Sequence, residues 1–338
     1  MKISFLVTYY EQAQYVEQSL NSILEIKKPC DWEILVGDDG SSDNTVDIVN
    51  GYIEKYPDNI KLFVMPREAG KKYAPIKRAS ENRINLLEHA EGDIFCTLDG
   101  DDRYVDKDFV GQAVELFEQN DNISVVCFAY ADYVNEVPKK THKLPKKVGC
   151  APVDKQAYMR FFYIHAGACV HKLIRSSVPQ IKKAGFFDDN DIVLNSLKHG
   201  EMYYIDKTIY AYRQTGDGIF TSMDSFEQAV LNVLGCDADI KIMGEEYRDI
   251  MLQRYAYAIM TAYLRKNSVK ELLGDKYTRY IGLCGDDKKS LCRDILTYSE
   301  LNAAKKDELD SLINTLKKQN RLLYAAAVLK NILRGFIK

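Results

Sequence analysis

The sequence has no apolar run long enough to cross a membrane as a helix. None of its segments approaches the roughly 18 consecutive apolar residues that a bilayer requires. The first residues run directly into a strand-like stretch, without the charged and apolar regions of a signal peptide. We therefore expect neither a membrane-spanning nor a secreted protein.

An excess of positive charge and cysteine pairs with metal-ligand spacing are also missing. The formal net charge is −3, which argues against nucleic acid as the main partner. The eight cysteines are scattered and none forms a Cys-x-x-Cys pair, so a zinc site is not expected. Buried free thiols in a reducing compartment are the simplest interpretation, and they favour a cytoplasmic protein.

What the sequence does have is the composition and patterning of a globular α/β protein. Hydrophobic residues make up 46% of the chain and charged residues 28%, and the 338 residues suit one large domain or two of ordinary size. Segments of helical spacing alternate with short β-favouring runs at 3–8, 33–37, 60–65, 94–98 and 123–130. This alternation predicts a mostly parallel sheet with flanking helices, and residues 221–338 read as helices.

Polar clusters follow three of the expected strands. They are TYYE (8–11), DDGSSD (38–43) and LDGDD (98–102). Ligands of α/β sheets bind beyond the carboxyl ends of the strands, so the three clusters predict one site at one edge of the sheet. In the second cluster Ser41, Ser42 and Asp43 are candidates for the N-cap of the next helix.

The segments FLVTYYEQAQYVEQSLNSIL, EILVGDDGSSDNTVDIV and AEGDIFCTLDGDD, taken together, resemble the N-terminal half of a family 2 glycosyltransferase of the GT-A fold. The resemblance implies a Rossmann-like GT-A domain over 1–220, with a nucleotide-binding half (1–130) and an acceptor-side half (131–220). It also implies an inverting, metal-dependent hexosyltransferase that uses a nucleotide sugar, favoured to be UDP-linked. The implied acceptor is a glycan or a polyprenyl-linked glycan of a bacterial surface polysaccharide.

The resemblance assigns the acids of LDGDD to the donor diphosphate. Asp99, Asp101 and Asp102 would hold Mg²⁺ or Mn²⁺, hard cations that prefer oxygen ligands. In the family one acid of this motif also reaches the ribose, and Asp99 and Asp101 are the candidates. The sequence leaves open which acid has which role.

Further nucleotide contacts are implied by matching positions. Asp39 matches the acid that binds the nucleobase, Asp38 either shares that role or caps the following helix, and Thr8 and Tyr10 line the base pocket. Lys77 and Arg78 are candidates for the diphosphate; a solvated basic helix face is the alternative. Two positions depart from the family pattern: Glu11 replaces an asparagine, and Thr215 replaces a frequent histidine.

The second half supplies a candidate general base for the acceptor hydroxyl. The stretch DDNDI (188–192) fits the family's Glu-Asp-x-Asp-Leu pattern, which makes Asp189 the base and Asp191 the alternative if the register shifts by two. A purely structural role at a helix N-terminus is the competing interpretation. The candidates for the acceptor side are His165, Asp188 and Arg213.

The end of the chain, residues 311–338, contains no acidic residue and predicts a basic amphipathic helix. Such a helix lies on an anionic membrane surface, here the inner face, or packs against a partner or another domain. Two other functions are alternatives. A sugar-phosphate nucleotidyltransferase needs a glycine-rich phosphate loop, which TYYEQAQYV lacks. A GT-A-like protein that binds glycans or partners without catalysis stays open.

Overall fold

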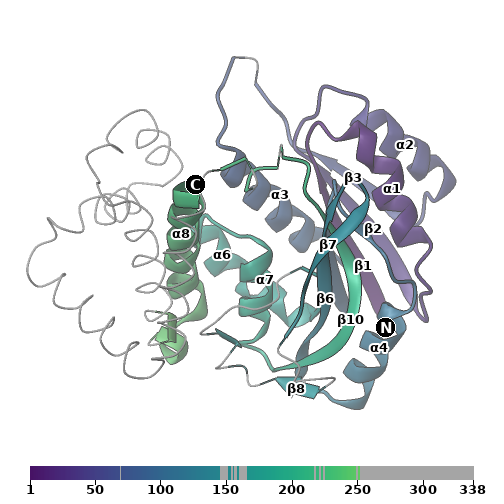
Figure 1. The fold of residues 1–338 in the computed structure, drawn as a ribbon. Coiled ribbons are helices and arrows are strands. Elements are labelled where there is room, and N and C mark those ends of the chain that lie inside the picture. Colours follow the sequence, from purple (N-terminus) through teal and green to yellow (C-terminus); the bar gives the residue numbers. More distant parts are fainter. Residues whose placement is uncertain are drawn as a thin grey trace, which may run out of the picture. The chain divides into compact units, whose positions relative to one another are not determined.

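The computed structural model describes residues 1–68, 70–144, 151–153, 155, 158–159, 166–216, 218–220, 222–223, 225–248 and 250–251. Contacts between Cα atoms divide the chain into two compact units, Met1–Thr221 and Ser222–Lys338. Figure 1 shows the elements of both units.

The first 134 residues of unit 1 alternate strands and helices as the sequence predicts. The elements are β1 (Lys2–Tyr9), α1 (Ala13–Leu24), β2 (Asp31–Asp38), α2 (Thr45–Lys55), β3 (Ile60–Val64), α3 (Pro75–His89), β4 (Ile94–Asp99), β5 (Arg103–Tyr104), α4 (Phe109–Gln119) and β6 (Ile123–Val134). All five predicted strands are present, within a few residues of their predicted ends.

The rest of unit 1 has shorter and more irregular elements. They are β7 (Val137–His142), β8 (Ala151–Val153), β9 (Ala168–His171), the 3₁₀ helix η1 (Lys172–Ser177), α6 (Val178–Ala184), α7 (Asp189–Ser196) and β10 (Glu201–Arg213). Unit 2 begins with α8 (Ser225–Met243) and η2 (Glu245–Tyr247), so its start is helical as predicted. The tail 311–338 lies outside the described residues.

The sheet of unit 1 is mixed, and the strands β1 to β4 pair with one another in parallel. Its strand order is β3-β2-β1-β4-β9-β6-β10-β5, with β7 beside β6 and β8 beside β10. The pairs β3–β2, β2–β1, β1–β4 and β6–β10 are parallel, and the other described pairs are antiparallel. The prediction of a mostly parallel sheet is therefore correct for β1 to β4 but not for the sheet as a whole. One reason is local: Asn135 and Glu136, both with positive φ, join β6 to β7 by a short hairpin, which forces antiparallel pairing.

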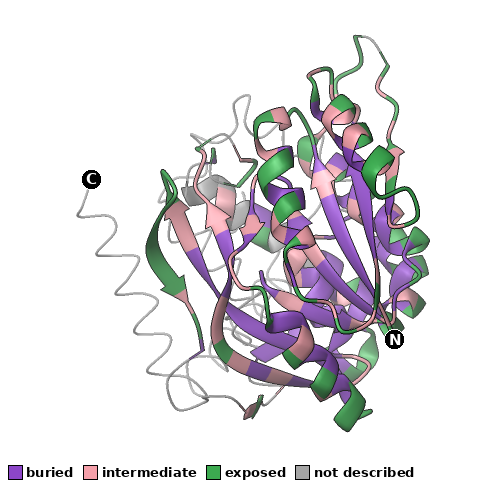
Figure 2. Cartoon of the chain, turned by 90° about the vertical axis from the view of Figure 1, so that its right-hand side faces the viewer, coloured by how far each residue is buried: buried purple, intermediate pink, exposed green. Residues whose placement is uncertain are grey.

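The helices cover both faces of the sheet. α1 and α2 lie on one face, and α3, α6 and α7 lie on the other (Figure 1). The hydrophobic spacing explains the packing of α1, because Val16, Leu20 and Ile23 recur every three or four residues and all three are buried. The central strands are buried along most of their length, as Figure 2 shows in purple. None of the helices in the described ranges is long and apolar enough to span a bilayer.

The turn after β4 packs tightly on the end of β1, and Gly100 makes this possible. A Cβ atom at Gly100 would lie 2.1 Å from Cδ1 of Tyr9, whose side chain is buried. Gly100→Ala is therefore expected to lower the free energy of unfolding by about 1–3 kcal/mol through overpacking. Chemical denaturation measures the loss.

Gly111 is the matched control for this prediction, because it lies in α4 with no atom within 4 Å of an added Cβ. Gly111→Ala should raise the free energy of unfolding by about 0.5–1 kcal/mol, the gain of alanine over glycine in a helix. Equal changes in the free energy of unfolding would contradict the tight packing of Gly100 against Tyr9.

Candidate functional site

The strand register brings the three polar clusters together. Thr8 of β1 pairs with Gly37 of β2 on one side and with Asp99 of β4 on the other. The backbone N–H of Gly100 donates to the carbonyl of Thr8 at 2.9 Å, and that of Asp39 donates to the carbonyl of Tyr9 at 2.9 Å. The clusters therefore meet at the carboxyl ends of three adjacent parallel strands, as the sequence predicts.

The acids of LDGDD have different surroundings. Asp102 is buried; Tyr210 Oη donates to its Oδ2 at 2.8 Å and the backbone N–H of Arg213 donates to its Oδ1 at 2.6 Å. Asp99 and Asp101 are half-buried. Burial, followed by the charge of Asp99, raises the pKa of Asp101 to about 6. Burial and the charges of Asp101 and Asp99 raise the pKa of Asp102 as well.

Asp102 and Arg213 make contacts that the sequence does not predict. Asp102 is buried and both of its oxygens accept hydrogen bonds from β10, whereas Asp99 and Asp101 are half-buried and therefore the more accessible carboxylates. Arg213, the last residue of β10, contacts LDGDD: its guanidinium donates to the backbone carbonyl of Asp101 and pairs with Glu136 at 2.9 Å. The sequence could not show this, because residue 213 meets the loop only through the sheet.

Arg83 on α3 is a site residue that sequence reasoning missed. Its Nη2 donates to Oδ1 of Asp99 at 2.8 Å and to Oδ2 at 3.2 Å. Burial alone would lower the pKa of Arg83, but the charges of Asp99, Asp189 and Asp188 outweigh burial and raise it. Clustered acids at a strand end need a nearby cation, which was the only signal for such a residue. Arg83 therefore pairs with Asp99, and the charges of the acids at the start of α7 also act on it.

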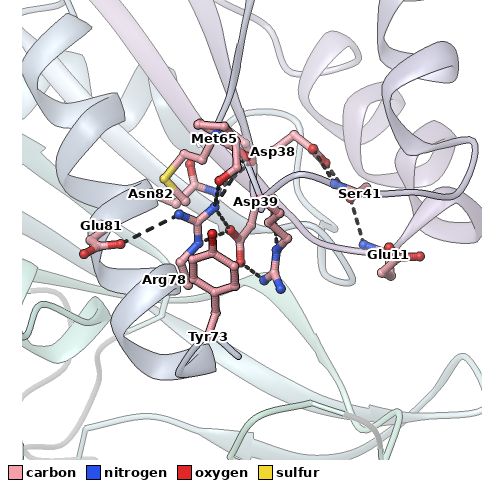
Figure 3. Close-up of polar contacts among 12 residues, drawn as sticks. Glu11, Asp38, Asp39, Ser41, Met65, Tyr73, Arg78, Glu81 and Asn82 are labelled. Atoms are coloured by element: carbon pink, nitrogen blue, oxygen red, sulfur yellow. Dashed lines mark hydrogen bonds and ion pairs between the residues drawn. The ribbon is translucent and has the colours of Figure 1, made fainter. Parts of the chain in front are cut away.

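Asp39 lies between Arg67 and Arg78, and Figure 3 shows it with Arg78. Arg78 of α3 is buried, and its guanidinium donates to Oδ1 of Asp39. On the other side Arg67 donates from Nη2 to Oδ2 of Asp39 at 2.5 Å and from Nε to the Asp39 carbonyl at 2.6 Å. The ring of Tyr73 lies 4.9 Å from the Arg78 guanidinium. Arg78 therefore sits at the predicted nucleobase acid, whereas Lys77 is exposed and 3.7 Å from Glu81.

Asp38 and Glu11 hold the neighbouring loops in place. Asp38 is buried and accepts from the backbone N–H of Ser41 at 2.8 Å and from its hydroxyl at 2.6 Å, so it caps the turn and not the helix. Glu11 has φ +52° and accepts from both the N–H and the hydroxyl of Ser42. Asparagine tolerates this left-handed conformation better than glutamate does, and the contacts with Ser42 compensate for the departure at this position.

The N-cap prediction for the second helix was wrong. The N-cap of α2 is Asn44, which makes no side-chain capping bond. Asp43 instead accepts from the backbone N–H of Thr45 at 3.0 Å and from that of Ala13, at the start of α1, at 3.0 Å. Its carboxylate therefore joins the starts of two helices, a long-range contact that local spacing does not encode.

The acids of α7 divide into two roles. The N–H of Asp191 donates to Oδ1 of Asp188 at 3.1 Å, and the N–H of Asp188 donates to Oδ2 of Asp191 at 2.8 Å. This reciprocal pair is a capping box that fixes the start of the helix. Asp191 is buried, whereas Asp189 between the two is half-buried. The capping box gives Asp191 a structural role and distinguishes it from Asp189.

Asp189 belongs to the same electrostatic environment as LDGDD. Burial raises the pKa of Tyr212, and the charges of Asp102, Asp189, Asp99 and Asp101 raise it further. The charges of LDGDD and of Asp189 therefore act on the same tyrosine. Within the described residues no group of three or more His, Cys, Asp or Glu side chains is arranged to hold a metal ion. His165 lies outside the described residues.

Comparison with known proteins agrees with this arrangement. The model of the family described as "Glycosyl transferase family 2" matches residues 4–175, about half of the chain. The chain belongs to glycosyl transferase family 2. The matched residues of the family 2 domain include all three polar clusters, and they end before α7 and Arg213.

This chain is similar to two curated proteins that carry glycosyltransferase names. It is 28% identical over 201 residues to "Uncharacterized glycosyltransferase MG060 homolog" of Mycoplasma pneumoniae, covering 59% of this chain and 63% of the relative. It is 30% identical over 102 residues to "Putative teichuronic acid biosynthesis glycosyltransferase TuaG" of Bacillus subtilis, covering 30% of this chain and 36% of the relative. The chain thus spans less than two thirds of either relative.

The fold is also found in a solved structure. The crystal structure of S. aureus TarS residues 1–349 superposes with a TM-score of 0.59 at 17% identity, covering 98% of this chain and 89% of TarS. A second crystal structure of the same TarS segment, in complex with UDP-GlcNAc, gives a TM-score of 0.60 at 16% identity over the same shares. At this identity the likeness shows that the two chains share the GT-A fold.

Proposed function

We propose that this family 2 member transfers a hexose from a UDP-sugar to a glycan or lipid-linked glycan acceptor, with inversion at the anomeric carbon. The observation that supports the proposal is the meeting of Asp39, Asp99 and Asp101 at the carboxyl ends of adjacent strands. Asp189 joins them through Arg83, which is hydrogen-bonded to Asp99 and whose pKa the charge of Asp189 helps to raise. These carboxylates match the three parts of such a reaction: the nucleobase, the diphosphate and the acceptor hydroxyl.

The pair of Asp39 and Arg78 suits a particular class of nucleobase. It presents a hydrogen-bond acceptor beside donors, because the Arg78 guanidinium is bonded to the Asp39 carboxylate. A carboxylate has about four lone-pair positions, so Asp39 can keep this bond and accept another. Uracil, thymine and guanine carry an N–H next to a carbonyl and fit this pair. Adenine and cytosine lack that arrangement, which makes ADP- and CDP-sugars poor candidates.

The carboxylates of Asp99 and Asp101 fit Mg²⁺ or Mn²⁺. Both are hard oxygen donors, and Mg²⁺ is usually bound by one or two carboxylates with waters and substrate phosphates completing the shell. The raised pKa of Asp101 reflects burial and repulsion from Asp99, and a cation would relieve both. A bound ion would neutralise the diphosphate and stabilise charge on the departing nucleoside diphosphate. Asp99 keeps Arg83 as its own counter-ion.

Asp189 is the proposed general base. It stands at the first position of α7, half-buried, while Asp188 and Asp191 fix the helix start around it. It would accept the proton of the acceptor hydroxyl as that oxygen attacks the anomeric carbon. Inversion in one step needs no enzyme nucleophile. The role in a bacterial surface polysaccharide, at the cytoplasmic face of the membrane, is part of the same proposal, and the name of the TuaG relative supports it.

Nucleotide selectivity tests the proposal. We expect isothermal titration in the presence of Mg²⁺ or Mn²⁺ to detect binding of UDP, dTDP and GDP. CDP and ADP should bind at least about tenfold more weakly, since an unmatched buried polar group costs roughly 1–3 kcal/mol. UDP-hexoses would then be screened for release of UDP. Equal affinity for all five nucleotides would contradict the proposed donor site.

A further inference from the structure

Arg67 occupies a slot between two aromatic rings. Its guanidinium carbon lies 4.0 Å from the centre of the Tyr10 ring and 5.2 Å from that of the Tyr73 ring. Tyr10 is 45% exposed, so without Arg67 its ring would be an open aromatic face beside Asp39. The guanidinium also hydrogen-bonds to the Asp39 carboxylate and to the Asp39 carbonyl.

These contacts are the ones that a nucleobase would make. A guanidinium is planar and delocalised, stacks on aromatic faces and donates hydrogen bonds in its own plane. A uracil ring stacked on Tyr10 and donating its N–H to Asp39 would need the same face and the same carboxylate. Arg67 and a nucleobase therefore exclude each other from this slot.

Arg67 is not held by a helix or a strand, so its side chain can leave the slot without disturbing one. Arg67 lies between β3 and α3, in a stretch without regular secondary structure. Its side-chain carbons cross Gly40, where an added Cβ would lie 3.0 Å from Arg67 Cγ. Arg78 holds Asp39 independently from α3, so Asp39 stays in position when Arg67 moves.

We propose that Arg67 fills the nucleobase slot of the free protein and that the donor's base displaces it. The proposal rests on the function proposed above, because it takes Asp39 as the nucleobase acid. We call the Arg67 side chain in this position the plug. It weakens the apparent affinity for the donor, because only the molecules in which the slot is open can bind the base. Arg67 thus sets donor affinity by competing with the base.

Titration of UDP into wild type and Arg67→Ala tests the plug. Arg67→Ala is expected to tighten the Kd for UDP by about tenfold, because its partly buried ion pair and its cation–π contact together contribute roughly that factor. Arg67→Lys keeps the charge but loses the planar fork, and it should lie between wild type and Arg67→Ala. Equal unfolding temperatures would show that the variants are folded.

Lys71 provides the matched control. It carries a charge in the same segment, with Nζ 5.4 Å from the centre of the Tyr73 ring and 2.8 Å from Glu68, and it makes no contact with Asp39 in the structure. Lys71→Ala should leave the Kd for UDP unchanged, which separates the plug from a general loss of positive charge.

The outcomes separate this inference from the proposed function. Tighter binding by Arg67→Ala, or binding by it alone, would support the plug. Weaker binding would mean that Arg67 contacts the bound base, and an unchanged Kd would mean that it does not compete; either result overturns the plug and leaves the donor site intact. If neither protein bound UDP, dTDP or GDP, both proposals would fall.

Discussion

Asp189→Asn is expected to lower the rate of sugar transfer by roughly a hundred- to ten-thousand-fold, the usual contribution of a general base. Asparagine is close to aspartate in size but cannot take the proton of the acceptor hydroxyl. Asp189 lies outside the capping box that fixes α7, so the fold should be retained. Nucleotide binding should be unchanged, because the nucleobase acid Asp39 follows β2 and its backbone N–H is bonded to Tyr9 of β1, not to α7. Steady-state kinetics with a saturating UDP-sugar measures the loss in kcat.

The neighbouring acids supply two controls. Asp188→Asn keeps a good N-cap, so it should preserve both stability and turnover to within a small factor. Asp191→Asn removes one of the two carboxylates of the capping box. It should cost about 0.5–2 kcal/mol of stability without a comparable loss of turnover per folded molecule. If Asp191→Asn abolished turnover while Asp189→Asn did not, the assignment of the base would have to be exchanged.

The features that the sequence predicted well are those written in consecutive residues. The strand from Ile3 to Thr8 and the polar residues that follow it are a single local pattern, and the same holds for Asp38 and Asp39. Because parallel strands all end at the same edge, the register then brings Thr8, Gly37 and Asp99 side by side without further information. The parallel strands and the meeting of the three polar clusters could therefore be predicted from short segments.

The features that the sequence did not predict depend on contacts between distant segments. Arg67 and Arg83 are single arginines without a motif, and their roles appear only when Asp39 and Asp99 are placed beside them. The burial of Asp102 has the same origin, because its partners come from β10, more than a hundred residues later. Spacing along the chain cannot distinguish Asp101 from Asp102, whereas burial and hydrogen bonding do.

The difference in burial between Asp101 and Asp102 predicts the second large effect, a loss of metal-dependent nucleotide binding. Asp101→Asn is expected to weaken the binding of UDP with Mg²⁺ or Mn²⁺ by at least about a hundredfold, since even the partners of metal ligands contribute up to roughly that factor. Asp101 is half-buried, and its carboxylate is held beside Asp99 while Arg213 fixes its backbone carbonyl. Titration of UDP at several metal concentrations, and in the presence of a chelator, measures the loss.

Asp102→Asn is the isosteric comparison one residue away. The oxygens of Asp102 are engaged by Tyr210 and by the backbone of Arg213, and asparagine can keep a bond to each of them. Because burial disfavours the charged form of Asp102, the amide should not destabilise the loop. We expect UDP and metal to bind within a few-fold of wild type, a loss far smaller than that of Asp101→Asn. Equal losses in the two variants would mean that both carboxylates hold the ion, and that donor binding breaks the hydrogen bonds of Asp102.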